Sequence, residues 1–175
     1  MKKILAFGGS TSSTSINKQL ASFTASLISK VETEIIDFKD FYVPIYSMDE
    51  EGNGFPDSMA ELSKLMKGFD GFVVSLAEHN GSYAAAFKNN LDWLSRIDRK
   101  IFNDKPVLLM AASSGGRGGA SVLADAEAYF PHAGASDIIS FSFPSFYQNF
   151  DNGQITNEEL KNQLLNKIHI FKNKL

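Results

Sequence analysis

Short apolar runs alternate along the chain with longer stretches in which apolar residues recur at helical spacing. Apolar runs that end at glycine or polar turns are typical of strands buried on both faces of a sheet. The pattern predicts five such strands, at residues 4–7, 34–38, 71–77, 106–112 and 137–143. Helical spacing marks the stretches around residues 20–28, 56–69, 84–94, 119–129 and 160–171.

Repeated alternation of strand and helix is typical of an α/β protein with a parallel sheet and right-handed crossovers. Five strands in 175 residues favour a three-layer, flavodoxin-like sandwich with strand order 2-1-3-4-5, formed by a single domain over residues 1–175. In such sheets ligands bind outside the carboxyl ends of the strands, where the strand order reverses. The loops after the first, third and fourth strands are therefore the candidate binding loops.

The loop after the first strand, residues 9–17, contains six hydroxyl residues in succession, directly before a predicted helix. A helix N-terminus offers unpaired backbone N–H groups and a partial positive charge, and hydroxyl groups add neutral donors. Together these features favour a seat for a terminal phosphate. The alternative is a capped helix with a flexible turn, because one hydroxyl is enough to cap a helix.

The other two loops contain groups suited to a planar polar ligand. Residues 77–83 place His79 and Tyr83 on either side of Asn80-Gly81, although that dipeptide is equally typical of a tight turn without chemistry. Residues 113–119 include four glycines, which allow the backbone to approach a ligand closely, or simply form a flexible turn.

Several well-known sites are excluded by the sequence. There is no Walker A loop, no Gly-x-Gly-x-x-Gly fingerprint and no Gly-x-Ser-x-Gly elbow. The absence of cysteine rules out disulfides, thiolate metal sites and cysteine nucleophiles. The 17 basic and 20 acidic residues give a net charge of −3, so no basic field is available to hold nucleic acid. We also expect no membrane span and a cytoplasmic location, because the apolar run after Lys2-Lys3 is too short for an export signal.

Three segments resemble signatures of one family. Gly9-Ser10-x-x-x-x-Ser15-x-Asn17 is similar to the phosphate loop of the NADPH-dependent FMN reductase family, which includes azoreductases and quinone or chromate reductases. Glu78-His79-Asn80-Gly81-Ser82, together with residues 87–96, resembles the second signature of that family more closely, and the turn 113–119 resembles the third. The likeness extends over nearly the whole chain.

The resemblance implies FMN as cofactor and NADPH or NADH as co-substrate. The residues that it places around FMN are Ser10, Ser12, Ser15, Ile16, Asn17, Glu78, His79, Asn80, Gly81, Ser113, Ser114, Gly115 and Gly116. Ser12 stands where the family commonly has an arginine, so the phosphate would depend on hydroxyls and the helix terminus. His79 stands in the usual place of a tyrosine. No catalytic acid or base is expected, because the flavin would carry the chemistry; His79 is the one candidate for proton supply.

We therefore expect an FMN-dependent NAD(P)H oxidoreductase that reduces a small acceptor (a flavin, quinone, azo compound or metal oxyanion) by a ping-pong mechanism. The alternatives are a flavodoxin-type electron carrier and a phosphate-ligand domain without redox activity. On its helix, Trp93 points about 130° away from the apolar stripe, which suggests a partner surface, although a covering loop would also explain it. Together with the resemblance, this predicts a homodimer or homotetramer.

Overall fold

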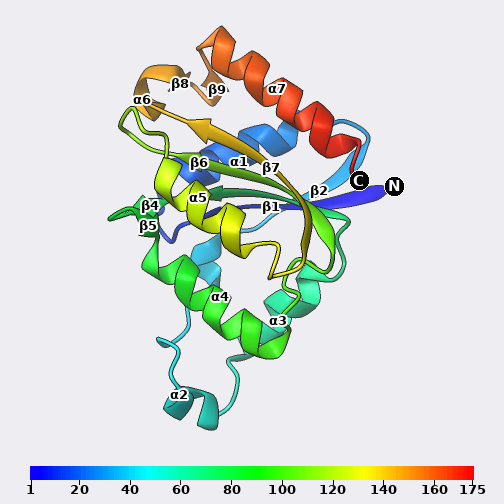
Figure 1. Cartoon of the computed structure of the whole chain (residues 1–175), viewed down its shortest axis with the longest axis vertical. Coiled ribbons are helices and arrows are strands. Elements are labelled where there is room, and N and C mark those ends of the chain that lie inside the picture. Colours follow the sequence, from blue (N-terminus) through cyan, green and yellow to red (C-terminus); the bar gives the residue numbers. More distant parts are fainter.

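A computed structural model describes all of residues 1–175 and contains a five-stranded parallel sheet in the order β2-β1-β3-β6-β7 (Figure 1). The strands of this sheet are β1 (Lys2–Gly9), β2 (Val31–Ile35), β3 (Gly71–Leu76), β6 (Lys105–Ala112) and β7 (Ala135–Phe143). Because these are the first to fifth strands of the sheet in chain order, the predicted flavodoxin-like order 2-1-3-4-5 is confirmed.

Helices cover both faces of the sheet, so the chain forms three layers (Figure 1). One face carries α1 (Ile16–Ser26) and α7 (Glu158–Lys172). The other face carries α3 (Asp57–Met66), α4 (Ala85–Ile97) and α5 (Ala120–Tyr129). The first and last helices begin at side-chain caps: Ser15 accepts from the Lys18 N–H, and Asn157 accepts from the Leu160 N–H.

The central strand β1 shows why the sequence needs continuous apolar runs. Ile4 and Ala6 pack into the core beneath α1 and α7, whereas Leu5 and Phe7 pack into the core on the opposite face. Successive side chains of a strand point to opposite faces, so both positions of the alternation must be apolar here. At the end of the strand a Cβ on Gly8 would lie only 2.8 Å from the carbonyl carbon of Asn17, so glycine is required for α1 to approach β1 this closely.

Short elements complete the fold at its periphery. A hairpin of β4 (Glu78–His79) and β5 (Ser82–Tyr83) follows β3. Its turn residues Asn80 and Gly81 have φ of 51° and 80°, the left-handed pair typical of a two-residue hairpin turn. The remaining elements are the 3-10 helix η1 (Phe38–Phe41), α2 (Met48–Gly52), α6 (Phe146–Asn149), β8 (Phe150–Asp151) and β9 (Gln154–Ile155).

The predicted position of the second strand was wrong by three residues at each end. The structure places β2 at Val31–Ile35 instead of residues 34–38, and Phe38 begins the 3-10 helix, where its side chain is buried. β2 is an edge strand and all of its residues are at least partly exposed, so it lacks the apolar run on which the prediction relied.

The partner-surface interpretation of Trp93 is wrong. Its side chain is fully buried by residues 42–55 of the same chain, which we call the covering segment. The indole Nε1 donates a 2.9 Å hydrogen bond to the carbonyl oxygen of Pro44, and the Tyr46 and Phe55 rings lie edge-on to it at 5.2 and 6.1 Å. Trp93 does leave the main apolar stripe of α4, but it is the covering segment, and not a second subunit, that buries it.

No helix of the chain combines the length and the apolar character needed to cross a membrane.

Two carboxylates form bonds between distant parts of the chain. From their lowered pKa values we can predict that the protein becomes less stable in acid. A backbone hydrogen bond of 2.9 Å from Lys3, reinforced by the charge of Lys2, lowers the pKa of Asp70 below its ordinary value of 3.8. A hydrogen bond from Lys174 likewise lowers the pKa of Asp137. A group with a lowered folded pKa stabilises the fold above its unfolded pKa, and this stabilisation is lost as the pH falls through the folded pKa.

We therefore expect Asp70→Asn to lower the free energy of unfolding at about pH 6 and to lower it by less at about pH 2.5. Urea unfolding of both proteins at the two pH values measures this difference. An equal cost at both would show that the Asp70 charge contributes nothing.

Candidate functional site

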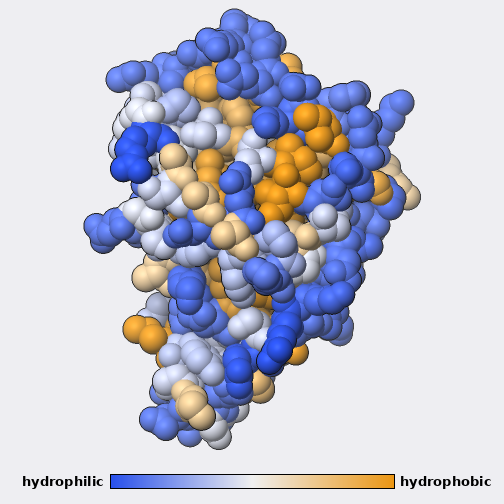
Figure 2. Space-filling model, viewed as in Figure 1, coloured by the Kyte–Doolittle hydropathy of each residue, from blue (hydrophilic) through white to orange (hydrophobic).

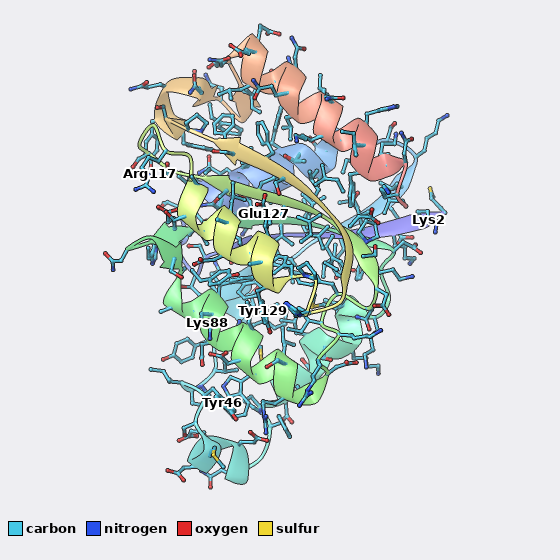
Figure 3. All side chains as sticks on the ribbon, viewed as in Figure 1. Lys2, Tyr46, Lys88, Arg117, Glu127 and Tyr129 are labelled. Carbon is cyan, nitrogen blue, oxygen red and sulfur yellow. The ribbon has the colours of Figure 1, made fainter.

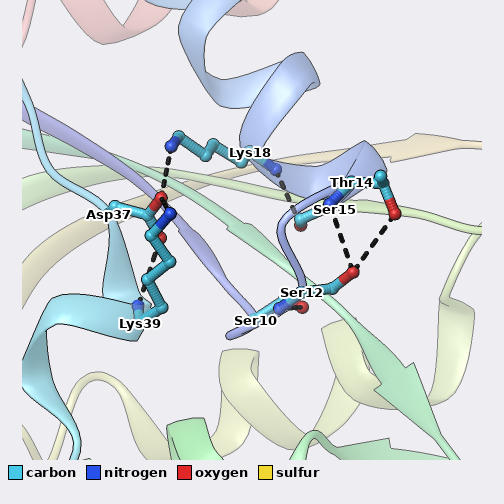
Figure 4. A network of polar contacts seen from close by, with 7 residues as sticks. All are labelled: Ser10, Ser12, Thr14, Ser15, Lys18, Asp37 and Lys39. Atoms are coloured by element: carbon cyan, nitrogen blue, oxygen red, sulfur yellow. Dashed lines mark hydrogen bonds and ion pairs between the residues drawn. The ribbon is translucent and has the colours of Figure 1, made fainter.

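The loop between β1 and α1 forms a cup of hydroxyl groups at the helix N-terminus. The Ser10 Oγ accepts from the N–H of Ser12 at 3.2 Å, and the Ser15 Oγ accepts from the N–H of Lys18 at 3.1 Å (Figure 4). Both serines are buried, yet as acceptors in these bonds they keep their hydroxyl protons for another partner. The N–H groups of Ile16 and Asn17 have no carbonyl partner within the helix, because both residues lie in its first turn.

The nearest cation on this helix is directed away from the cup. The Lys18 side chain forms an ion pair with Asp37, and Lys39 also approaches the Asp37 carboxylate, at 3.5 Å (Figure 4). Burial alone would raise the pKa of Asp37, but hydrogen bonds from Lys18 and from the Lys39 backbone, with both positive charges, lower it overall. With Lys18 paired in this way, the donors in the cup are uncharged.

Asn17 is buried and holds three elements together at the edge of the sheet. Its Oδ1 accepts from the Ala112 N–H at 2.8 Å and from the Ser75 hydroxyl at 2.7 Å. Its Nδ2 donates to the Ala112 carbonyl at 3.2 Å. The side chain therefore joins α1 to the ends of β3 and β6, and the backbone N–H of Asn17 remains available to a ligand.

The hairpin after β3 is anchored through its acidic residue. The Glu78 Oε2 accepts from the N–H groups of Ser121 and Val122 at 2.9 and 3.0 Å, in the first turn of α5. The Gly119 N-cap of α5 provides no side-chain bond, so Glu78 caps that helix from outside. The negative charge is thus satisfied at a positive helix terminus, and the exposed His79 stands beside it.

The glycine turn after β6 contributes one residue, Ser114, to the lining of the site. Ser114 lines the same space as the β1 loop, whereas the Ser113 hydroxyl donates within the turn to the Gly115 carbonyl at 2.9 Å. Tyr147 of α6 also lines this space and is largely exposed, and its neighbour Phe146 donates its N–H to the Ser113 carbonyl at 3.0 Å. Arg117, within the turn, donates to the Ser121 hydroxyl at 2.9 Å on the outer surface (Figure 3).

These three loops line one open cavity of about 280 Å³, close to the lower limit of about 300 Å³ for small-molecule pockets. The sequence-predicted residues that line it are Ser10, Ser12, Ser15, Ile16, Asn17, Glu78, His79 and Ser114. Those that lie outside its lining are Asn80, Gly81, Ser113, Gly115 and Gly116. The lining residues missing from the prediction are Thr14, Ala77, Ala112 and Tyr147.

The signals for the missing residues were partly present in the sequence. Thr14 belongs to the hydroxyl run, and Tyr147 follows a dense group of aromatic residues. Chemically, the cavity offers hydroxyls, helix N–H groups and no unpaired carboxylate at the cup, which suits a phosphate-bearing ligand. No cluster of three or more His, Asp or Glu side chains is arranged to hold a metal ion.

Residues 2–148 match the protein family described as NADPH-dependent FMN reductase. The chain is 31% identical over 173 residues to 2-hydroxy-1,4-benzoquinone reductase of a Burkholderia species, covering 93% of this chain and 90% of that protein. It is 37% identical over 79 residues to a quinone reductase of Escherichia coli K12. That match spans 45% of this chain and only 42% of the length of the relative.

Solved structures show the same fold. FerB, a flavoenzyme NAD(P)H:(acceptor) oxidoreductase from Paracoccus denitrificans, superimposes with a TM-score of 0.79 at 22% identity over 99% of this chain and 97% of that one. An FMN-dependent NADH-azoreductase from Bacillus anthracis, solved in complex with FMN, gives 0.62 at 16% identity, with 99% of each chain covered. Given a family match that covers most of the sequence, the chain belongs to the NADPH-dependent FMN reductase family.

Proposed function

We propose that the chain binds FMN in the cavity formed by the three loops and uses it to oxidise NAD(P)H and reduce a small acceptor. The observation that carries this proposal is the convergence of the β1 loop, the hairpin and the glycine turn on one cavity at the carboxyl edge of the sheet. Family membership supplies the class of reaction, and the relatives named as quinone reductases and azoreductase indicate the kinds of acceptor.

The donor set fits the phosphate end of FMN. The N–H groups of Ile16 and Asn17, with the hydroxyls of Ser10, Ser12 and Ser15, are suited to bind a phosphate at the positive end of α1. Charge-assisted hydrogen bonds are about twice as strong as neutral ones, so a cup without arginine should hold FMN less tightly than one with it. The hairpin residues His79 to Gly81 and the turn Ser113–Gly116 would border the flavin ring.

Bound FMN would supply the redox chemistry, a two-electron transfer from NAD(P)H to the acceptor by a ping-pong mechanism. The protein would supply position and electrostatics. Glu78 fixes the hairpin to α5, and the exposed His79 offers a ring contact or a proton for the reduced acceptor. The resemblance still predicts a homodimer or homotetramer, and light scattering can test it.

A visible spectrum is the most direct test. We expect purified protein mixed with FMN to retain flavin absorbance, and NADPH or NADH added without air to bleach it. A flavodoxin-type carrier would retain FMN but would need a reductase to be bleached. A phosphate-ligand domain without redox activity would remain colourless.

Ser15→Ala tests the phosphate seat. The change removes one donor from the cup and the cap of α1, so we expect the Kd for FMN to rise about tenfold. The quenching of flavin fluorescence on titration measures Kd, and far-UV circular dichroism checks that the variant is folded.

Ser26→Ala is the matched control, because its hydroxyl donates to the Phe23 carbonyl at the opposite end of the same helix. Equal FMN affinity in the two variants would place the phosphate elsewhere.

A further inference from the structure

Lys18 is a positive charge attached at the rim of the cup. It is the third residue of α1, and its backbone N–H donates to the Ser15 Oγ at 3.1 Å. Its side chain nevertheless leaves the cup: Figure 4 shows it extending away from Ser10 and Ser12 toward Asp37, with which its Nζ forms an ion pair. Because the lysine side chain is a flexible four-carbon stem, the same ammonium group could turn toward the cup if nothing held it outside.

The carboxylate that holds Lys18 is fixed by the backbone around it. Asp37 is the N-cap of η1, and its Oδ1 accepts from the Lys39 N–H at 3.1 Å. The next residue, Phe38, is buried and stacks on Phe7 of β1 with the ring centroids 5.1 Å apart. Asp37 is therefore attached to the core of the fold, whereas the Lys18 stem is the adjustable partner of the pair.

This carboxylate is also less exposed than those of the other ion pairs. Figure 2 shows hydrophilic residues spread over most of the visible surface, and the other paired carboxylates belong to side chains that are 24–63% exposed. The side chain of Asp37 is only 11% exposed. Exposed ion pairs contribute little to stability, but a carboxylate that is largely removed from water requires a positive charge beside it.

Two lysines approach Asp37, and they are not equivalent. Lys18 Nζ is the nearer, and Lys39 Nζ lies 3.5 Å from the Asp37 Oδ2. If Lys18 turned into the cup, Asp37 would keep only the more distant partner, which would cost electrostatic energy. This cost opposes the attraction between Lys18 and a phosphate group, which carries between about 1.5 and 2 negative charges at pH 7.

We propose that Asp37 is a positioning residue that limits the affinity of the cup for the phosphate of FMN by holding Lys18 outside the cup. The inference rests on the proposed function, because it needs a phosphate at the N-terminus of α1. The serine hydroxyls of the cup would donate neutral hydrogen bonds, and a charged donor would bind about twice as strongly. The chain thus contains the cation that the cup lacks, and Asp37 keeps that cation from the phosphate.

Asp37→Asn tests this role directly. The amide removes the negative charge but keeps an oxygen that can accept from the Lys39 N–H, so the cap of η1 is retained. We expect the Kd for FMN to fall about fivefold, because Lys18 is then free to contact the phosphate. The Kd for riboflavin, which has no phosphate, should not change. Quenching of flavin fluorescence on titration of the flavin-free chain measures both constants.

Asp40→Asn is the matched control. Asp40 lies in the same 3-10 helix, and its exposed carboxylate forms no ion pair with Lys18. The substitution therefore removes a nearby negative charge without releasing the lysine, and we expect neither Kd to change. Asp37→Ser, which introduces another uncharged capping residue, should give the same fivefold fall and serves as the test if Asp37→Asn does not fold.

Lys18→Met separates the holding of the lysine from simple repulsion of the phosphate by Asp37. We expect this substitution to change the Kd for FMN by less than about twofold in the native chain, and to raise it about fivefold in the Asp37→Asn background. High salt should weaken FMN binding more in Asp37→Asn than in the native chain. The same effect of Lys18→Met in both backgrounds would overturn the proposal, since Asp37 would then act only through its own charge.

An unchanged Kd for FMN in Asp37→Asn, or equal changes for FMN and riboflavin, would also overturn it. A native chain that binds neither flavin would instead overturn the proposed function. The two failures are therefore distinguishable.

Discussion

Asn17→Ala should lower the free energy of unfolding by about 3–5 kcal/mol, the largest effect that we expect from a single substitution in the site. The alanine would leave the N–H and carbonyl of Ala112 and the hydroxyl of Ser75 without their partner at a buried position. Each unsatisfied buried group costs about 1–3 kcal/mol, and partial relaxation or an entering water keeps the total below the full sum.

Urea unfolding followed by circular dichroism measures this loss. Ser12→Ala is the control from the same loop: its exposed hydroxyl makes only 3.4 Å contacts with Thr14, so we expect a change within about 0.5 kcal/mol. Ser75→Ala combined with Asn17→Ala should cost less than the sum of the single changes, because both remove the same bond. A loss below about 1 kcal/mol for Asn17→Ala would show that the buried network is not stabilising.

Glu78→Ala should cost about 2 kcal/mol of stability and also weaken FMN binding. It removes the acceptor of two N–H groups at the start of α5, and with it the contact that fixes the hairpin beside the cavity. Glu78→Gln keeps a carbonyl oxygen but loses the charge at the helix terminus, so we expect about half the loss.

Thermal or urea unfolding gives the stability, and flavin fluorescence gives the affinity. Glu127→Ala, on the exposed side of α5 (Figure 3), is the control and should change neither quantity. If Glu78→Ala retained full stability, the capping bonds would have no energetic role. If it lost stability but retained FMN affinity, the hairpin would not border the flavin.

The place of the site could be predicted from the sequence because it depends on topology. Strand alternation gave the order of the sheet, and in a doubly wound sheet the loops after its first, third and fourth strands meet at one edge. The directions of individual side chains could not be predicted in the same way. Asn17 and Glu78 both belong to the signatures that the chain resembles, and only coordinates show that one joins two strands and the other caps α5.

A covering loop was one of the two explanations for Trp93, but which segment covers it could not be predicted, for a different reason. The residues of the covering segment have no helical or strand periodicity, so no pattern indicated that it folds back over α4. The helical spacing correctly placed Trp93 off the main apolar stripe of that helix. The bonds that cover it run from side chains of α4 to backbone groups some 45 residues earlier, for example from Asn89 to Pro44. Contacts between residues so far apart in the chain produce no local sequence pattern from which they could be predicted.

The bonds of Asn17 have a consequence for ligand entry. They run between the start of α1 and the ends of β3 and β6, the same groups that frame the cup of hydroxyls. The frame is therefore assembled when the protein folds, before any cofactor arrives. Because the donors are already in place, binding of a phosphate requires little ordering of the chain. This low ordering cost partly compensates for the absence of a cationic side chain from the cup.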